Sequence, residues 1–308
     1  MRKGWLGTIL LSIMLIFFFS YKEDIAKVVM QKVTSQKETT LPDSNNYDNN
    51  ISFQFVQKTD DFHVKNYQNL LNVIYTILSN GTDEFTFYCD ESYSECMNDF
   101  DKVSRDQVLL STINNMVSPY NSYEKVYFKS TNYGMITMSV DKQYSSEDID
   151  LIEGKINEFI ANNINDEMNA YDKIKAFHDY VINNSVYDKE RATAIENGND
   201  TSNSSSHKAN GPLIDGIGLC SGYSDAMKIY LDKLSITSYK ISNTNHIWNL
   251  VYINGGWLHL DLTWDDPVTN TGDNLLLHKF FLIDTNTLFE LDSAGHNYNS
   301  DYYLEVSH

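Results

Sequence analysis

The sequence of 308 residues is poor in cysteine and in basic side chains, and each shortage excludes a class of protein. Cys89, Cys96 and Cys220 are too few for a disulfide-stapled scaffold, and one thiol stays unpaired if the other two join. The 23 Lys and Arg stand against 42 Asp and Glu, which gives a net charge of -19. Nucleic acid is therefore not an expected partner, because phosphate binding depends on clustered basic residues. The 42% of hydrophobic residues is enough for one large or two modest globular domains.

Cys89 and Cys96 have no histidine-rich segment or third cysteine nearby, so a zinc site is not expected there. Outside the cell the two thiols can form a local disulfide. Two unlinked thiols of no catalytic importance are the alternative.

The N-terminus indicates export. Arg2 and Lys3 precede an uncharged stretch, residues 4–21, whose length is near the ~18-residue lower limit for a membrane-spanning helix. No small-x-small cleavage motif follows it. We expect residues 1–21 to be an uncleaved membrane anchor, with a cleaved signal peptide as the second interpretation, and the remaining chain to be extracytoplasmic. Residues 22–52 are polar and without periodicity, which predicts a flexible stalk.

Two structured regions are expected after the stalk. In residues 53–144, the patterns predict a helix ending at Asn80-Gly81, a strand at 84–89, a helix begun by a capping box of Ser104 and Gln107, and a hairpin at 126–140. This region is predicted to be a small α/β unit. In residues 145–308, the periodicity predicts a larger α+β region with helices at 145–160, 171–183 and 224–234 and strands at 237–242, 245–253 and 257–264.

A glycine-rich loop leads into a helix at Cys220. Gly218 and Gly222 flank the cysteine, and apolar residues then recur at three- and four-residue intervals: Tyr223, Ala226, Met227, Tyr230, Leu231 and Leu234. We therefore expect Cys220 at a helix N-terminus, where unpaired backbone N–H groups and the helix dipole stabilise a thiolate, the reactive form of cysteine. A small buried cysteine without reactivity is the alternative.

The hairpin that follows supplies a histidine and a carboxylate. Asn254-Gly255 between alternating apolar runs predicts a two-residue turn. In that register Trp248 faces Asp261, so His246 and Asp261 are diagonal neighbours on one sheet face, about 7–8 Å apart at the backbone. An imidazole at this place can take the proton of a thiol, and a carboxylate beside it can hold the imidazole in the useful tautomer. The backbone N–H of Cys220 is the expected first oxyanion donor.

Two other assignments use the same residues. His259 lies on the same hairpin face and is the rival base. Cys220, His246 and either Asp261 or His259 can also ligate zinc, so a zinc enzyme is a competing hypothesis.

Three further segments have a structural and a functional interpretation. His178-Asp179 suggests acid–base chemistry, but the histidine lies on the apolar stripe of a helix and is interpreted as structural. Asp265-Asp266-Pro267 has oxygen ligands for calcium, yet an acidic turn at the end of a strand is the preferred interpretation. Residues 188–211 are predicted to be an exposed loop that either covers a cleft or is a surface insertion.

Three ordered motifs, residues 218–223, 245–249 and 257–267, resemble the signatures of the transglutaminase-like superfamily. The resemblance covers roughly residues 145–295. It implies an α+β, papain-like core in which a nucleophile-bearing helix packs on an antiparallel sheet, so that residues 145–308 are the catalytic domain. In this resemblance Cys220 is the nucleophile, His246 the base and Asp261 the orienting acid, and we expect no cofactor and no metal. Ser221 replaces an acidic residue often found after the nucleophile in related bacterial proteins, which leaves the substrate preference open.

The resemblance implies thiol-dependent acyl transfer from amides without fixing the acceptor. We expect an extracytoplasmic, membrane-tethered enzyme acting on protein or peptide substrates at the cell surface or wall. Hydrolysis by a peptidase or amidase is slightly favoured over glutamine cross-linking by a transglutaminase. No calcium loop and no accessory domain of the animal cross-linking enzymes is evident. The remaining alternative is a surface binding module that keeps the fold without turnover.

Overall fold

The computed structural model describes residues 21–22, 24–26, 28–30, 32–33, 39–48, 50–199, 204–268 and 275–306. The segment predicted as an anchor or signal peptide, residues 1–21, lies outside the described residues except for Tyr21. Within the described ranges, no helix has both the length and the apolar character that crossing a membrane requires.

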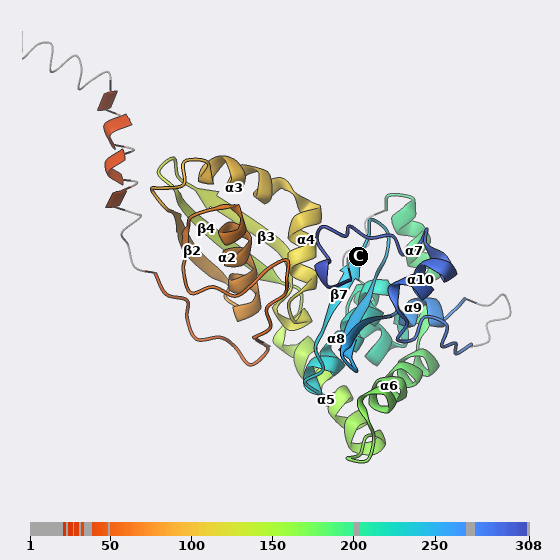
Figure 1. Ribbon diagram of the computed structural model, residues 1–308. Coiled ribbons are helices and arrows are strands. Elements are labelled where there is room, and N and C mark those ends of the chain that lie inside the picture. The colour runs from red at the N-terminus through yellow and green to blue at the C-terminus, as the bar shows by residue number, and fades with distance from the viewer. Residues whose placement is uncertain are drawn as a thin grey trace, which may run out of the picture.

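The first region is built on a four-stranded sheet in the order β1-β2-β4-β3 (Figure 1). β1 pairs parallel with β2, and the other pairs are antiparallel. The strands are β1 (His63–Val64), β2 (Glu84–Cys89), β3 (Tyr123–Ser130) and β4 (Met135–Lys142). The helices of this region are α2 (Tyr67–Asn80), α3 (Cys96–Arg105), α4 (Gln107–Asn115) and the short 3-10 helix η1 (Pro119–Asn121). The predicted strand and hairpin are both present.

The end of α2 and the start of α4 show which sequence signals predict a helix boundary correctly. Gly81, with φ of 79°, ends α2 in the left-handed conformation that the Asn80-Gly81 pair predicts. The predicted capping box of Ser104 and Gln107 is wrong. Asp106 caps α4 through a bond from the Leu109 backbone N–H to its carboxylate at 2.9 Å, and Ser104 lies inside α3, a helix that was not predicted. An aspartate directly before the helix satisfies an N–H of the first turn, so no serine is needed there.

Part of the segment predicted as a flexible stalk is folded onto the first region. Leu41 and Ile51 pack against its apolar core, and the Tyr47 ring meets the Tyr120 ring edge-on at 4.7 Å. The Asn45 amide donates to Asn121 Oδ1 at 2.7 Å. A few apolar residues that pack on the core are therefore enough to order part of a polar segment. The average composition of the segment does not indicate them.

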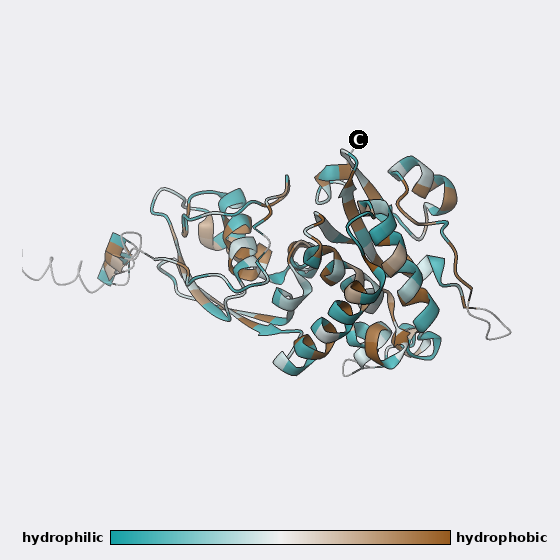
Figure 2. Ribbon diagram, turned by 90° about the horizontal axis from the view of Figure 1, so that it is seen from below, coloured by the Kyte–Doolittle hydropathy of each residue, from teal (hydrophilic) through white to brown (hydrophobic). Residues whose placement is uncertain are grey.

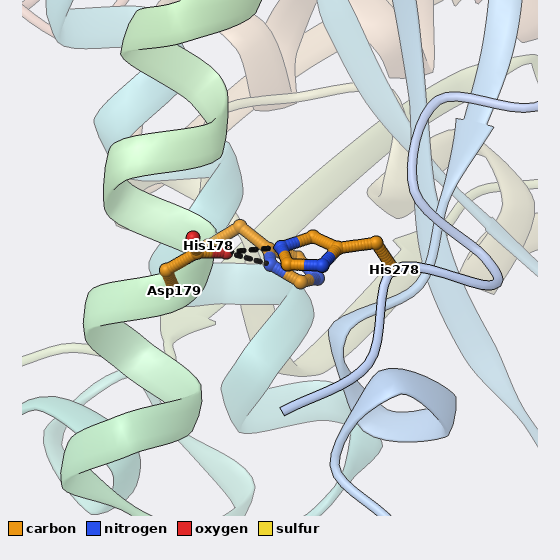
Figure 3. Close-up of side chains that lie close together, drawn as sticks. All are labelled: His178, Asp179 and His278. Atoms are coloured by element: carbon orange, nitrogen blue, oxygen red, sulfur yellow. Dashed lines mark hydrogen bonds and ion pairs between the residues drawn. The ribbon is translucent and has the colours of Figure 1, made fainter. Parts of the chain in front are cut away.

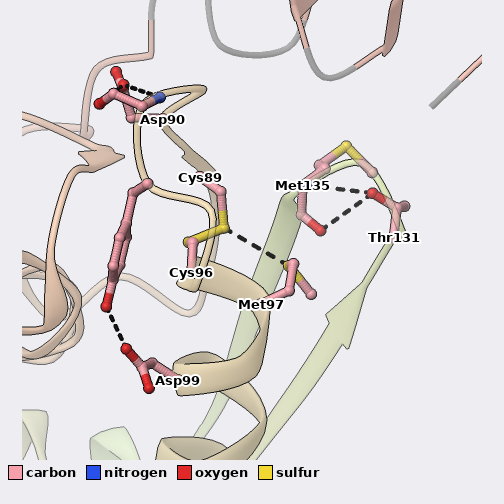
Figure 4. The surroundings of a disulfide bond; sticks show 9 residues. Cys89, Asp90, Cys96, Met97, Asp99, Thr131 and Met135 are labelled. Atoms are coloured by element: carbon pink, nitrogen blue, oxygen red, sulfur yellow. Dashed lines mark hydrogen bonds between the residues drawn. A yellow bond between two sulfur atoms is a disulfide. The ribbon is translucent and has the colours of Figure 1, made fainter. Parts of the chain in front are cut away.

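Cys89 and Cys96 form a disulfide and are therefore not two free thiols (Figure 4). The bond joins the end of β2 to the start of α3, and both cysteines are buried. Met97 follows Cys96, and its sulfur lies 3.7 Å from that of Cys89. Cys220 is consequently the free cysteine of the chain.

The second region places helices against a three-stranded antiparallel sheet in the order β7-β8-β9. The strands are β7 (Ser238–Ser242), β8 (Ile247–Ile253) and β9 (Gly256–Leu260), and a short parallel pair joins β5 (Val186–Tyr187) to β6 (Ile217–Gly218). Helix α8 (Cys220–Lys233) packs on β7 and β8. The other helices are α5 (Ser146–Asn163), α6 (Ala170–Asn184), α7 (Lys189–Glu196), α9 (Leu262–Asp265), α10 (Thr285–Asp292), the 3-10 helices η2 (Ser205–His207) and η4 (Leu304–Val306), and the π-helix η3 (Gly211–Asp215). The predicted α+β class is confirmed, and the helix that begins at Cys220 packs on an antiparallel sheet.

The β8–β9 turn has the predicted form. Asn254 and Gly255 both have positive φ, 54° and 84°, as a two-residue hairpin turn of the favoured type requires. Ile253 pairs with Gly256 across it, which is the register that directs His246 and Asp261 to one face.

The described parts of the predicted loop, residues 188–199 and 204–211, contain regular structure and buried residues. They contain α7, and their described C-terminal part is largely buried, including Ser206, Ala209 and Gly211. The Ser206 carbonyl accepts the Leu219 backbone N–H at 2.8 Å, so this segment lies against the entrance to α8.

The two regions share an apolar core. One continuous buried cluster joins the first region, for example Leu109 and Ile113 of α4, to Ile241 and Trp248 of the second sheet. The Asn115 amide also donates to Ser242 Oγ at 2.8 Å across this boundary. Figure 1 shows α4 between the first sheet and β7, and Figure 2 shows helices with apolar and hydrophilic residues on different sides. The apolar sides of α2 and α4 contribute to the shared cluster, whereas those of α5, α6 and α8 form a second buried cluster.

The close approach of residues 204–211 to α8 predicts a strict requirement for glycine at position 222. A Cβ on Gly222 would lie 2.5 Å from the Ser206 carbonyl oxygen and 2.8 Å from that of Lys208. Both are backbone atoms, so Gly222→Ala should lower the free energy of unfolding by about 1–3 kcal/mol, the usual range for overpacking. Urea denaturation of the purified protein measures this change.

Gly154→Ala is the matched control. Gly154 is also helical, and a Cβ added there would have no neighbouring atom within 4 Å, so alanine should be neutral or stabilising by up to ~1 kcal/mol. Equal stabilities of the two variants would contradict the close packing at Gly222.

Candidate active site

Cys220 is the first residue of α8, as predicted, and its side chain is partly exposed. The residue before it, Leu219, occupies the N-cap position and has no side-chain acceptor for the N–H groups of the first turn. Those N–H groups and the positive end of the helix dipole favour a negative charge beside the Cys220 sulfur.

Helix α8 is fixed to the sheet by buried polar contacts. Asp225 Oδ1 pairs with Lys240 Nζ of β7 at 2.6 Å, and Asp225 Oδ2 accepts the Tyr144 hydroxyl at 2.7 Å. Ser224, the residue before Asp225, donates from its Oγ to the Ile247 carbonyl at 3.0 Å, and the Asn249 amide donates to the Ser224 carbonyl at 2.9 Å. The first turn of α8 and the start of β8 are thereby held together, which brings Cys220 and His246 to the same place.

His246 stands immediately before β8, in contact with both other members of the predicted triad. Its Nε2 lies 2.5 Å from Asp261 Oδ2, and its ring stacks on Trp248 with centroids 5.5 Å apart. Burial lowers the pKa of His246, but the Asp261 carboxylate and a hydrogen bond with Cys220 act in the opposite direction and raise the pKa from 6.5 to about 10. The imidazole therefore holds a proton strongly at neutral pH when the neighbouring groups are charged.

Asp261 is buried, and both of its oxygens accept hydrogen bonds. Oδ1 accepts the backbone N–H groups of Thr263 and Trp264 at 2.9 and 3.2 Å, so Asp261 is also the N-cap of α9. Oδ2 faces His246. Burial by itself raises the pKa of Asp261, yet the histidines beside it hold that pKa well below its usual range. The group is a carboxylate with a fixed orientation.

His296 is a site residue that the sequence analysis did not identify. It is fully buried, its Nε2 lies 2.9 Å from Asp261 Oδ2, and its Nδ1 lies 3.2 Å from Asp292 Oδ2. Phe280 stacks on the ring with centroids 5.0 Å apart. His296 stands 35 residues after Asp261, outside the three motifs. The four-residue spacing of Asp292 and His296 is a weak signal, and it does not point to Asp261.

His259, the rival base, has both ring nitrogens bonded to residues outside the predicted triad. Its Nδ1 accepts the Trp248 indole N–H at 3.0 Å, its Nε2 lies 3.1 Å from Thr285 Oγ1, and the ring is fully buried. Burial and the neighbouring His296 lower the pKa of His259 to about 3. It holds Trp248, on which the His246 ring stacks.

The acidic turn after the hairpin is bonded to the protein itself. Asp265 Oδ1 accepts the backbone N–H groups of Lys279 and Phe280 at 2.7 and 3.0 Å, and Asp266 Oδ2 accepts the Tyr223 hydroxyl at 2.5 Å. Burial raises the pKa of Asp266 to about 6 although the Tyr223 bond lowers it. These contacts support the interpretation as a structural turn over the calcium alternative.

Residues 158–262 match the family model of the transglutaminase-like superfamily, so the predicted resemblance is confirmed over this part of the chain. Similar solved structures include a TGase, with 18% identity and a TM-score of 0.36 over 46% of this chain and 44% of that chain. A candidate cysteine protease from Cytophaga hutchinsonii has 14% identity and a TM-score of 0.27 over 45% of this chain and 61% of that chain. The chain thus spans less than two thirds of either structure. No curated protein matches.

The contact of Cys220 with His246 predicts that thiol reactivity depends on the imidazole. Because Cys220 is the free cysteine of the chain, iodoacetamide labels a single position. His246→Ala should slow this labelling at pH 7 by at least ~10-fold, since the thiolate loses its stabilising partner. Mass spectrometry of timed samples gives the rate. His63→Ala, a control in the first region, should label at the wild-type rate, and equal rates for all three proteins would contradict the pairing.

The bond from His296 to Asp261 predicts a positioning effect that a donor can restore. His296→Leu should lower the labelling rate of Cys220 because Asp261 Oδ2 loses one of its two histidine donors and fixes His246 less firmly. His296→Gln keeps an N–H donor and should retain a larger part of the rate. The ratio of the two rates, measured for variants of equal melting temperature, isolates the hydrogen bond. If Leu and Gln gave the same rate, the proposed role of the His296 donor would be wrong.

Proposed function

We propose, from the premise that residues 158–262 match the transglutaminase-like superfamily, that the protein is a thiol-dependent enzyme of amide acyl transfer. The single observation that supports this most is the convergence of Cys220 at the start of α8, His246 before β8 and Asp261 at the start of α9. A thiol at a helix N-terminus, an imidazole in contact with it and a buried carboxylate behind the imidazole form the arrangement of a nucleophile, a base and an orienting acid.

In the proposed reaction, the Cys220 sulfur attacks the carbonyl carbon of an amide, and His246 carries the thiol proton. A tetrahedral intermediate forms, with negative charge on the former carbonyl oxygen. The backbone N–H of Cys220 faces that oxygen as the first donor of an oxyanion hole, because it belongs to the open first turn of α8. Collapse of the intermediate breaks the C–N bond, and His246 gives its proton to the leaving amine. A thioester remains on Cys220.

The second half of the reaction releases the acyl group. Water or a primary amine attacks the thioester, His246 takes a proton from the attacking group, and the thiol leaves from the acyl carbon and is protonated again. Water gives a carboxylic acid, and an amine gives a new amide. Asp261 keeps its charge throughout and stabilises the imidazolium form of His246. Hydrolysis is the slightly favoured outcome, with glutamine cross-linking as the alternative.

The proposed place of action is outside the cytoplasm, with the chain tethered to the membrane by its N-terminal apolar segment. The basic residues before that segment support export. The Cys89–Cys96 disulfide supports it as well, because disulfides persist in oxidising compartments. The proposed substrates are proteins or peptides of the cell surface or wall that lie within reach of the tether.

The proposal predicts that catalysis requires the Cys220 sulfur. With a panel of glutamine-containing and peptide substrates, Cys220→Ala should reduce turnover by at least ~10³-fold, because no thioester can form. Ser221→Ala, one residue further along the same helical turn, is the matched control and should keep most of the activity. A transient mass increase on the wild-type protein, equal to the acyl group and absent from Cys220→Ala, identifies the thioester.

The reaction products show whether water or an amine attacks the thioester. New cleaved termini indicate a peptidase, a mass increase from amide to acid at glutamine indicates deamidation, and incorporation of a labelled primary amine indicates cross-linking. Wild-type turnover in Cys220→Ala on every accepted substrate would exclude the assigned nucleophile. Absence of turnover in all proteins, together with slow labelling of Cys220, would favour a binding module.

A further inference from the structure

A second cluster of metal-ligating side chains lies at a different place from Cys220. His178 and Asp179 are adjacent on α6, and His278 comes from the segment that follows residue 275 (Figure 3). Asp179 Oδ1 lies 3.0 Å from His178 Nδ1 and 2.6 Å from His278 Nε2. One atom of each residue lies within 4.8 Å of the corresponding atoms of the other two. Two segments 99 residues apart in the sequence thus direct two imidazoles and one carboxylate at the same point.

The remaining polar atoms of two members are bonded to other residues. His178 Nε2 faces Asp265 Oδ2 at 3.3 Å, and Lys175 Nζ donates to Asp179 Oδ2 at 2.5 Å. Metal-binding histidines almost always donate their second ring N–H to a carboxylate or carbonyl, which fixes the tautomer and directs the other nitrogen at the metal. Asp265 is fully buried and supplies this carboxylate. The inner atoms of His178 and Asp179 are thereby oriented by their outer contacts.

The cluster is accessible from one side. The His178 side chain is 0% exposed, whereas those of Asp179 and His278 are 25% and 35% exposed. An ion can therefore reach the point where the three atoms meet without unfolding of α6. The buried histidine gives the point a fixed position, and His278 can adjust.

We propose that His178 Nδ1, Asp179 Oδ1 and His278 Nε2 bind one divalent ion of the zinc class, with water as the fourth ligand. Two imidazoles and one carboxylate suit zinc, whereas calcium and magnesium take oxygen ligands. Zinc bonds of about 2.0–2.2 Å place neighbouring tetrahedral ligands about 3.3–3.6 Å apart. The separations of 3.0 and 2.6 Å have to widen by ~1 Å or less to reach that tetrahedral spacing, which small rotations of the partly exposed His278 and Asp179 side chains provide.

This ion would link two segments of the fold. Asp265 connects the cluster to the backbone of Lys279 and Phe280, and the Phe280 carbonyl accepts the Asp261 backbone N–H at 3.0 Å. An ion at His178 and His278 would therefore fasten the segment that supports Asp261 to α6. The inference does not depend on the proposed acyl-transfer function, because it concerns residues that do not touch Cys220.

The test is a zinc titration of the full chain after removal of metals with a chelator. The Cys220→Ala protein is the parent, so that the free thiol cannot bind zinc. Competition with a chromophoric chelator should give one zinc per chain at micromolar concentration. His278→Ala and Asp179→Asn should each weaken binding by at least ~100-fold, since loss of a ligand costs no less than loss of an outer contact. Zinc should also raise the melting temperature of the parent and leave that of His278→Ala unchanged.

Metal-ligand spacing is also found in a second group, made of His246, Asp261 and His296. The His246→Ala variant of the same parent shows which of the two groups binds the zinc. This variant should keep the one zinc. Loss of zinc in His246→Ala with retention in His278→Ala would assign the ion to the active site and overturn the proposal. Absence of stoichiometric zinc in the parent would show that the cluster is a hydrogen-bonded network only, and it would overturn the proposal as well.

Discussion

The buried Asp261 carboxylate is the interaction on which the candidate site depends. One oxygen caps α9, and the other faces His246 and His296, so a single side chain fixes the end of the hairpin, the start of a helix and the orientation of the imidazole. A buried carboxylate is costly unless its oxygens are bonded, and here the donors come from three separate segments. The geometry of the candidate site and the local fold are therefore stabilised by the same hydrogen bonds, and neither can change alone.

The other half of the site is fixed by α8. Asp225 and Lys240 form a buried ion pair between the helix and the sheet, supported by the Tyr144 hydroxyl. Removal of one partner of such a pair leaves an uncompensated charge in the interior, which penalises every arrangement in which the helix has shifted along the sheet. Cys220 and His246 lie at the end of this contact. The position of α8 along the sheet thus brings Cys220 and His246 together, in addition to the attraction between these two side chains.

The sequence predicts those features that neighbouring residues determine. Cys220 at a helix start depends on the glycines and apolar spacing around it, and the hairpin register depends on Asn254 and Gly255, all within a few positions. His296 was missed because its partner is 35 residues away, and the contact of His178 with Asp265 spans 87. Such contacts arise only when whole elements pack, and no local period encodes them. Leu41 and Ile51 were missed for a related reason, since two apolar anchors do not alter the polar average of their segment.

The common core of the two regions has a consequence for how this protein can change over evolution. Tyr239, Ile241, Trp248 and Leu250 of the second sheet belong to the same buried cluster as α2 and α4. Without the first region these side chains would form a large exposed apolar patch, which in water favours association. Trp248 also carries the stacked His246. Recombination near residue 145 would therefore have to exchange matching surfaces on both sides, and the two regions are expected to be inherited together.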